Sequence, residues 1–393
     1  MFQVARFLIL KFRGFKMLKP KTEAEVAEIV SGAASPFEVM GTGTKRGLGR
    51  AVSNMPQLSL QNFSKVLAYE PEELILDVGA GALLSDVEKL IDAKQQYLAF
   101  EPPNLSKLLG SNHSGTMGGV LACNLSGPRR IKAGAARDHI LGLRGVSGRG
   151  EIFKAGARVV KNVTGYDVPK LMAGSYGTLA AFTSVIFKIL PKPETEETLV
   201  LRSLDDVTAA MQMSVAMQSS CEVSGAAHIP KVGTFLRLEG IAPSVTYRRD
   251  QLIKLLSGKV EVMDAKNSAT QWRSIRDVHP LADGREHMVW RISATPSLAP
   301  WVISKLKAQI DLRYYFDWAG GLIWLDTPQD AAAIIRAAIG DGHATLIRAS
   351  DEMRASEDVF QPQPQALAAL SVRVKHSFDP SGLFNPGRMY KGV

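Results

Sequence analysis

Two glycine-rich segments carry the residue types best suited to binding a phosphorylated ligand. The first reads GTGTKRGLGR over residues 41–50, and the second reads GTMGGVLACNLSGPRR over residues 115–130. Glycines allow successive backbone N–H groups to turn toward one point, where they form a concave array of donors for phosphate oxygens. Positive charge that can offset a phosphate group comes from Lys45, Arg46, Arg129 and Arg130. These features predict a large anionic ligand that approaches the backbone closely.

Other phosphate-binding motifs do not fit these segments. Residues 41–47 have G-x-G-x-x-x-G spacing, but no helix is expected directly after them, so a Rossmann fingerprint is a poor match. A P-loop requires Gly-Lys followed by Ser or Thr, and the sequence has none. A third segment, residues 161–193, strengthens the case for one ligand site. Its polar turn KNVTGYD leads to a helix start, then to a GSYGT turn and a strand.

The elements that must position these segments begin close to the N-terminus. Thr22 opens a helix through a capping box, and a strand at 37–40 leads into the first glycine segment. A helix is expected over 83–96, just before the second segment. Residues 139–156 then read as a hairpin that turns at glycines.

Pro191 and Pro193, with the acidic stretch ETEE after them, mark the clearest domain boundary. Beyond it, strands alternate with helices, which predicts a compact α/β or α+β sandwich, with two split βαβ units as one way to build it. One helix is expected over 327–342, where Thr327 can cap it and Gly340 can stop it. The C-terminal sequence FDPSGLFNPGRMY is rich in Gly and Pro yet aromatic, so we expect an ordered segment docked on another part of the chain.

The composition is ordinary for a globular protein of two or three domains. The chain has 393 residues, of which 46% are hydrophobic and 22% charged, and its net charge is +9. This excess suits an anionic ligand, an acidic partner or a lipid headgroup surface. The scattered basic residues without aromatic neighbours argue against nucleic acid. Two cysteines, Cys123 and Cys221, are too few to hold an iron–sulfur cluster, and they suit a reducing compartment.

Residues 1–16 stand apart from the rest of the sequence. They read MFQVARFLILKFRGFK, a mixture of apolar and basic side chains that can lie on a membrane surface or imitate a signal segment. No apolar run in the sequence approaches the ~20 residues needed to cross a bilayer. Because a capped helix begins soon after Met17, we expect an N-terminal extension or a misassigned start. We therefore expect a cytoplasmic protein, at most peripheral at the inner face of the cytoplasmic membrane.

Taken together, the three segments resemble the FAD-binding domain of the vanillyl-alcohol oxidase/PCMH flavoproteins. Within that superfamily, the sequence is most similar to the FAD-binding subunits of bacterial glycolate oxidase. The resemblance extends to ACNLSGPRR, VWRIS, DWAGGLIWL, GDGHAT and FNPGRMY, and it runs from about residue 35 to the C-terminus. It implies an α+β fold with a PCMH-type two-subdomain FAD-binding domain at 17–195 and an α/β sandwich cap at 196–350. A C-terminal segment, 351–393, would return to the flavin.

The resemblance also implies which residues hold FAD. The first glycine segment would bind the pyrophosphate, and the second would line the pyrophosphate and ribityl chain and approach the flavin ring. The GSYGT turn, with the backbone near Val185, would frame the adenosine side, and Asn385 would return toward the isoalloxazine. The residues implied are Gly41, Thr42, Gly43, Thr44, Lys45, Thr116, Met117, Gly118, Gly119, Ala122, Asn124, Gly174, Ser175, Gly177, Thr178, Val185 and Asn385. Members that attach FAD covalently usually offer a histidine in the first segment, which has none here, so non-covalent FAD is expected.

The catalytic candidates are His343 and Arg291. Relatives that act on 2-hydroxy acids carry a motif with two histidines beside the flavin, whereas this chain has only IGDGHAT, with His343. No metal site is therefore expected, and the resemblance does not imply turnover by this chain alone. Arg291 and Arg348 have the planar fork that binds a carboxylate through two hydrogen bonds, although an arginine on a solvated strand face explains each of them equally well.

The function implied is that of the FAD-binding subunit of a glycolate oxidase or dehydrogenase complex. A 2-hydroxy acid would pass a hydride to the flavin, and the electrons would move on to partner subunits. The partners implied are a larger flavin-containing catalytic subunit and an iron–sulfur subunit. Two alternatives stay open: a catalytically silent subunit that holds FAD for assembly, and a free-standing FAD-dependent 2-hydroxy-acid oxidoreductase.

Overall fold

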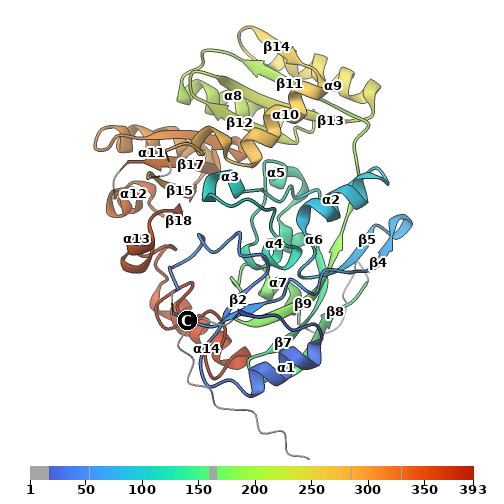
Figure 1. The fold of residues 1–393 in the computed structure, drawn as a ribbon. Coiled ribbons are helices and arrows are strands. Elements are labelled where there is room, and N and C mark those ends of the chain that lie inside the picture. The colour runs from blue at the N-terminus through green and yellow to red at the C-terminus, as the bar shows by residue number, and fades with distance from the viewer. Residues whose placement is uncertain (1–16, 53, 159–165, 285, 329) are drawn as a thin grey trace, which may run out of the picture.

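The structure, a computed structural model, describes residues 17–52, 54–158, 166–284, 286–328 and 330–393. Its N-terminal part and its cap lie one above the other, and the C-terminal segment runs back beside the N-terminal part (Figure 1). The segment 1–16 and most of the KNVTGYD turn lie outside the described residues. No helix within the described ranges is long and apolar enough to cross a membrane.

Two small sheets build the N-terminal part. The parallel sheet has the order β1 (Met17–Leu18), β3 (Gln57–Ser59), β2 (Glu38–Met40). The antiparallel sheet has the order β4 (Val66–Glu70), β5 (Ile75–Gly79), β9 (Ala180–Lys188), β7 (Ile140–Ser147), β8 (Ile152–Gly156). A short pair, β6 (Gln96–Tyr97) with β10 (Leu190–Pro191), lies where the chain leaves this part. The hairpin expected over 139–156 is confirmed as β7 and β8.

Short helices connect and cover these strands. They are α1 (Glu23–Ser31), α2 (Leu84–Asp92), α3 (Ser106–Leu109), α4 (Met117–Cys123), α5 (Arg130–Ala133), α6 (Ala136–His139) and α7 (Val168–Met172). The helix start predicted at Thr22 is confirmed, since its side chain accepts a hydrogen bond from the Glu25 backbone N–H at 3.2 Å. The helix expected over 83–96 is shorter, because the chain leaves it at Ala93 for β6.

The second glycine segment is not the open loop that its composition predicts. Residues 117–123 form α4, and Thr116 caps it by accepting a hydrogen bond from the Gly119 N–H at 3.3 Å. Glycine is needed in this helix because α4 lies directly on the end of β5. A Cβ at Gly118 would lie 2.9 Å from the carbonyl oxygen of Ala80. Close packing therefore explains a glycine that the sequence alone attributes to ligand binding.

The cap is one antiparallel sheet made of two similar halves. The first half follows the chain as β11 (Thr195–Leu201), α8 (Asp206–Gln218), β12 (Gly225–Ile229), β13 (Gly233–Gly240), α9 (Ala242–Leu255) and β14 (Val260–Met263). After α10 (Ala265–Arg276), the second half repeats this order as β15 (Met288–Ser293), α11 (Ala299–Lys307), β16 (Arg313–Asp317), β17 (Leu322–Thr327), α12 (Ala332–Ile339) and β18 (His343–Arg348). The strands join as β14-β11-β13-β12-β16-β17-β15-β18, so each half is a split βαβ unit and the halves meet at β12 and β16.

One helix of the cap differs from its sequence prediction. Thr327 is the last residue of β17 rather than the cap of a helix, and α12 begins five residues later at Ala332. Thr327 faces Met288 in the β15–β17 ladder, so strand pairing takes the place of capping. The stop predicted at Gly340 is confirmed, because this residue has a φ of +59° at the end of α12.

The two faces of the cap sheet pack differently. The outer face packs under α8, α9, α11 and α12 and forms a large apolar core with residues such as Trp290 and Ile292. The inner face forms a second core in which Trp318, Trp324 and Tyr315 of the cap pack with residues of α3 and α4. Side chains alternate along β15, so Trp290 and Ile292 belong to the outer core and Arg291 points to the inner face. The seam between the two parts is therefore a packed, largely apolar layer.

The C-terminal segment docks on the N-terminal part, as its aromatic composition predicts. It contains α13 (Asp351–Ser356) and α14 (Gln365–Phe378). The buried Lys375 ammonium donates to the carbonyl oxygens of Thr178 and Phe384 and to the Asp379 carboxylate at 2.6–2.8 Å. The Phe37 N–H donates to the carbonyl of Leu383 at 2.7 Å. The chain end is thus fixed beside β2 and the GSYGT turn.

Candidate functional site

A pocket lies between the parallel sheet and the antiparallel sheet of the N-terminal part. The space between its walls, open solvent at the mouth included, is about 720 Å³. Its walls come from β2, the first glycine segment, α4 and β9, and the C-terminal segment contributes Asn385 and Arg388. All three segments that the sequence analysis selected therefore converge on one site.

Eleven of the residues predicted to hold a cofactor line this pocket. They are Gly41, Thr42, Gly43, Thr44, Lys45, Thr116, Gly118, Gly119, Ala122, Gly177 and Asn385. The other six lie nearby without lining it. Met117, Thr178 and Val185 are buried in the protein, Asn124 ends α4 in the left-handed conformation, and Gly174 and Ser175 sit in the turn before Tyr176.

Several lining glycines leave no room for a side chain. A Cβ at Gly41 would lie 2.4 Å from the hydroxyl of Thr116, and one at Gly177 would lie 2.8 Å from the side-chain nitrogen of Asn385. A Cβ at Gly115 would lie 2.1 Å from the Lys45 ammonium. The Thr42 hydroxyl is buried at the pocket and has no partner among the described groups. The walls therefore bring backbone and an unpartnered donor to the pocket surface.

Lys45 supplies positive charge inside the pocket. Its ammonium is surrounded by protein atoms, while the side chain is still partly open to the pocket space. Burial lowers the pKa of Lys45, and the nearby thiol of Cys123 offsets this effect only in part. Among the described residues it has no ion pair or hydrogen bond. A buried ammonium without a counter-ion is costly, which favours an anionic ligand at this position.

Arg46, one of the cations noted beside the first glycine segment, also lines the pocket. Nine lining residues were not predicted: Val39, Met40, Leu60, Ala80, Cys123, Tyr176, Ala180, Phe182 and Arg388. Most lie within three residues of a predicted one, so reading each motif with its neighbours would have found them. Tyr176 is the most informative. It has a φ of +53° in the middle of the GSYGT turn, and its ring packs edge-on against Phe360 at 4.9 Å. Left-handed backbone at a bulky residue persists only where the surroundings enforce it.

Two long-range contacts hold the pocket walls in place. Asn385, with a φ of +43°, accepts a hydrogen bond from the Val39 N–H at 2.8 Å and donates to the carbonyl of Tyr176 at 2.9 Å. Arg354 of α13 donates to the carbonyls of Arg46 and Gly49 at 3.2 and 2.9 Å, which fixes the first glycine segment. The C-terminal segment therefore acts as a brace for both glycine-containing walls.

The cap contributes Arg291 beside this pocket. Burial lowers the pKa of Arg291 to about 10, and the charges of Tyr176 and Arg130 also act on it. Its guanidinium carbon lies 5.0 Å from the centre of the Trp318 ring. Tyr176 lines the pocket, and it is close enough to Arg291 for the arginine's charge to affect the pKa of Tyr176. The pocket and the inner face of the cap therefore meet at Tyr176.

Comparison with known proteins identifies the family. A family model described as an FAD binding domain matches residues 16–156. The chain is 33% identical over 358 residues to the glycolate oxidase subunit GlcE of Escherichia coli, across 91% of this chain and 93% of that protein. The chain belongs to the GlcE family of FAD-dependent oxidoreductases.

This GlcE-family chain also resembles a D-lactate dehydrogenase over about half its length and a solved structure over most of it. The D-lactate dehydrogenase of Anaerostipes hadrus is 32% identical over 207 residues, which cover 51% of this chain and 42% of that enzyme. A solved structure of alkyldihydroxyacetonephosphate synthase superposes with a TM-score of 0.65 at 15% identity, over 93% of this chain and 76% of that one. The expected PCMH-type α+β fold and the expected FAD cofactor are thus confirmed.

The residues of the pocket fit FAD. Thr42 and Lys45 offer an unpartnered hydroxyl and an unpaired ammonium to a pyrophosphate. Charge-assisted hydrogen bonds to phosphate are among the stronger polar contacts in proteins. Apolar walls from Leu60, Ala180 and Phe182 suit the rings of a dinucleotide.

His343 and Arg348 lie elsewhere in this GlcE-family chain. His343 is exposed at the start of β18, where it faces Ser293, and it does not line the pocket. Arg348 is already occupied, since it binds the Asp326 carboxylate at 3.2 Å and the carbonyls of His287 and Gly284. No group of three or more potential metal ligands occurs in the part of the chain that the structure describes.

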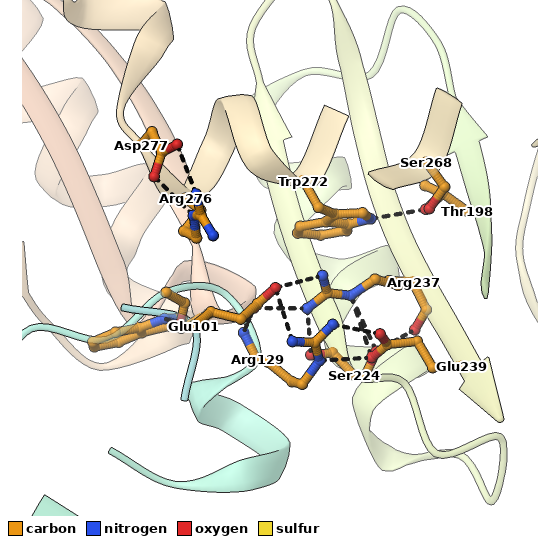
Figure 2. A network of polar contacts seen from close by, with 12 residues as sticks. Glu101, Arg129, Thr198, Ser224, Arg237, Glu239, Ser268, Trp272, Arg276 and Asp277 are labelled. Carbon is orange, nitrogen blue, oxygen red and sulfur yellow. Dashed lines mark hydrogen bonds and ion pairs between the residues drawn. The ribbon is translucent and has the colours of Figure 1, made fainter. Parts of the chain in front are cut away.

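A buried charge network joins the two parts of the molecule (Figure 2). Glu101 accepts hydrogen bonds from both terminal nitrogens of Arg237 at 3.0 Å, and the backbone N–H of Arg129 donates to it at 2.6 Å. The Arg129 side chain in turn donates to Glu239 of β13 at 3.0 Å. Burial alone would raise their carboxyl pKa values, but the two guanidinium groups lower the pKa of Glu101 and hold that of Glu239 at about 2. We call these four residues the seam network.

Proposed function

We propose that this chain is the FAD-binding subunit of a complex that oxidises the CH–OH group of a 2-hydroxy acid, with glycolate converted to glyoxylate. The observation that carries this proposal is the match to a glycolate oxidase subunit over 93% of that protein, combined with a pocket that fits FAD. The shorter match to a D-lactate dehydrogenase supports the same substrate class. Bound FAD supplies the hydride acceptor.

The residues of this chain would then have distinct tasks. The backbone and side chains of residues 41–45 and 116–119 hold the pyrophosphate and ribityl part, and β9 with the GSYGT turn supports the adenosine side. Lys45 places its positive charge against the cofactor. Arg291 and Tyr176 face the space on the cap side of the pocket. Domain limits at 17–195, 196–350 and 351–393 belong to the same proposal.

The proposal includes partner subunits because a relative is named as a subunit. A larger flavin-containing catalytic subunit and an iron–sulfur subunit would receive the electrons, since the only cysteines, Cys123 and Cys221, are separate and buried. Fe–S clusters generally need four ligands. The complex would lie in the cytoplasm or at the inner face of the cytoplasmic membrane.

A second candidate function is a catalytically silent subunit that holds FAD. It is favoured by the residues around the pocket, because the described lining residues include no His, Asp or Glu. Oxidation of an alcohol requires a group that accepts the hydroxyl proton as the hydride leaves. Burial raises the pKa values of Tyr176 and Cys123, which weakens the tendency of both to ionise.

One experiment separates these functions. The full chain is purified alone, loaded with FAD, and mixed without oxygen with glycolate or D-lactate while the flavin absorbance is followed. Bleaching by either acid is the expected result for a catalytic subunit. Absorbance that persists in the isolated chain but bleaches after co-purification with its partners supports the silent subunit. Absence of FAD binding, even with added FAD, would overturn both.

A further inference from the structure

Two arginine side chains lie on one indole ring at the seam without a carboxylate partner. The guanidinium carbon of Arg130 is 4.3 Å from the centre of the Trp318 ring, and that of Arg291 is 5.0 Å from it. Arg130 begins α5 of the N-terminal part, and Arg291 lies on β15 of the cap. Within the described ranges, neither side chain makes an ion pair or a hydrogen bond.

This arrangement costs free energy as it stands. Each guanidinium gains from the indole face, but two like charges on one ring repel each other. The Arg291 side chain is half-buried, and withdrawing an unpaired charge from water in this way is unfavourable. Burial and the charge of Arg130 both act to lower the pKa of Arg291, to about 10. The missing interaction is the one that a bound anion would provide.

The carboxyl group of Asp317 does not provide the missing negative charge. Asp317 precedes Trp318, and its Oδ1 accepts a hydrogen bond from the Trp318 backbone N–H at 2.7 Å. It makes no ion pair with Arg291 within the described ranges. Burial raises the pKa of Asp317 to about 7, so a large share of this carboxyl is neutral at neutral pH. The guanidinium pair therefore keeps an uncompensated positive charge.

The backbone around Trp318 is held in an unusual conformation. Trp318, Ala319 and Gly320 have φ values of +51°, +54° and +99°. The first two are non-glycine residues with positive φ, a costly conformation that persists where surrounding contacts enforce it. The indole N–H donates to the carbonyl of Gly127 at 3.0 Å, so the N-terminal part fixes the ring from its side of the seam. The backbone conformation and this hydrogen bond together fix the position of the Trp318 ring at the seam.

We propose that Arg130 and Arg291, both packed on Trp318, form a clamp that binds the carboxylate group of a small 2-hydroxy acid across the seam. The identity of the ligand rests on the proposed function. Arg291 supplies a planar fork that matches a carboxylate, and the more exposed Arg130 closes the site from the other side of the seam. Because Tyr176 joins this place to the cofactor pocket, the clamp holds the acid beside the flavin end of that pocket. Neutral analogues are rejected, since they leave the half-buried Arg291 guanidinium unpaired.

The test uses the FAD-loaded full chain and calorimetric titration with oxalate, an acid that has no CH–OH group to oxidise. We expect oxalate to bind and its neutral diamide, oxamide, not to bind. Arg291→Met should weaken oxalate binding about 10- to 100-fold, as loss of a charge-assisted contact predicts. Arg291→Lys should lie in between, because it keeps the charge and loses the fork. Arg130→Met should weaken binding less, because Arg130 is more exposed.

Arg202→Met is the matched control, since Arg202 is a half-exposed arginine paired with Glu261 far along the cap sheet. Its oxalate affinity should equal that of the unaltered chain. Flavin absorbance and thermal melting show whether each variant is folded. The proposal is overturned if oxalate does not bind, if oxamide binds equally well, or if Arg291→Met and the control bind oxalate alike.

Failure of the clamp and failure of the proposed function can be told apart. Oxalate binding that depends on Arg291, in a chain and complex that oxidise no 2-hydroxy acid, would keep the clamp and overturn the proposed reaction. Bleaching of the flavin by glycolate at the same substrate concentration in Arg291→Met and the unaltered chain would keep the reaction and overturn the clamp.

Discussion

Two pairs of arginines at the seam between the N-terminal part and the cap differ in whether carboxylates balance their charge. Arg129 and Arg237 share two buried carboxylates, so the four charged groups of the seam network balance. Arg130 follows Arg129 directly in the sequence, yet it and Arg291 have an indole and no carboxylate. Balanced buried charges can fasten two parts together, whereas unbalanced ones carry a cost that a ligand relieves. Of the two adjacent arginines in the SGPRR stretch, Arg129 therefore joins the two parts of the molecule and Arg130 belongs to the proposed binding site.

Lys45 extends this comparison into the cofactor pocket. Like Arg291, it is enclosed by protein and has no counter-ion among the described residues. By contrast, Lys375 is more deeply buried than Lys45 but is satisfied by Asp379 and two carbonyl oxygens. The fold thus pairs Lys375, which fixes the C-terminal segment, and leaves Lys45 in the pocket and Arg291 at the seam without a counter-ion among the described residues. The predictions below test this division.

The largest effect is expected from breaking the seam network. Glu101→Gln removes one carboxylate and leaves Arg129 and Arg237 with a single counter-ion in a buried setting. Breaking a buried ion pair by removing one partner costs ~3–5 kcal/mol. We expect the free energy of unfolding in urea to fall by about that amount. A fall below about 1 kcal/mol would mean that the network does not fasten the seam.

The second prediction concerns the pH dependence of stability at Asp317. Its pKa is raised to about 7 by burial, above the value of about 3.9 in an unfolded chain. Between these values the unfolded state loses its proton first, so stability falls as pH rises from about 4 to about 7 and is level above it. The whole decrease is about 4 kcal/mol at most.

Asp317→Asn removes this titration while keeping an oxygen that can accept from the Trp318 N–H. From pH 5 to pH 8, the unfolding free energy of the unaltered chain should therefore fall relative to that of Asp317→Asn. Asp311→Asn, at an exposed carboxylate of the cap, is the control and should show no such change. A difference in unfolding free energy that is independent of pH would show that Asp317 is ionised throughout. Asp317 would then be a counter-ion, and the comparison between the two arginine sets would fail.

The first glycine segment and the C-terminal return were predictable because their chemistry is local. The glycines and the lysine of GTGTKRG suit anion binding whatever the surrounding fold. The aromatic side chains of FDPSGLFNPGRMY favour burial, so this segment is expected to dock on another part of the chain. In the same way, alternating strands and helices predicted the split βαβ units of the cap. The two units are not visible as a repeat in the sequence, because their residues differ although their connections repeat.

The inner face of the seam could not be predicted, because its properties come from contacts between distant residues. The Trp318 indole depends on the carbonyl of Gly127, and the turn at Tyr176 depends on Asn385. The sequence shows Thr327 before Pro328 and suggests a helix cap, but pairing with β15 keeps that residue in a strand. His343 was selected because IGDGHAT partly matches the two-histidine motif of the relatives that act on 2-hydroxy acids, and the structure leaves it exposed at the start of β18.

A smaller effect is expected from Lys45 in the cofactor pocket. Lys45→Met removes the ammonium that has no protein partner, so FAD affinity should fall about 10- to 100-fold, measured by quenching of FAD fluorescence. Lys45→Arg keeps the charge and should retain most of the affinity. Since burial lowers the pKa of Lys45, affinity should also decline in alkaline solution at a lower pH than for an ordinary lysine. Lys45→Met should lack this decline, and an unchanged pH profile would place Lys45 away from the cofactor.

The smallest effect is expected from an ion pair that faces water. Arg202 and Glu261 are paired at 3.1 Å on the outer edge of the cap sheet, and both side chains are nearly half exposed. Glu261→Gln should change the free energy of unfolding by about 0.5 kcal/mol or less, and added salt should abolish the difference. The same salt series should leave most of the loss caused by Glu101→Gln in place, because water and ions do not reach the seam network. Equal salt sensitivity of the two variants would show that the seam is open to solvent, and burial would no longer explain why its arginines need partners.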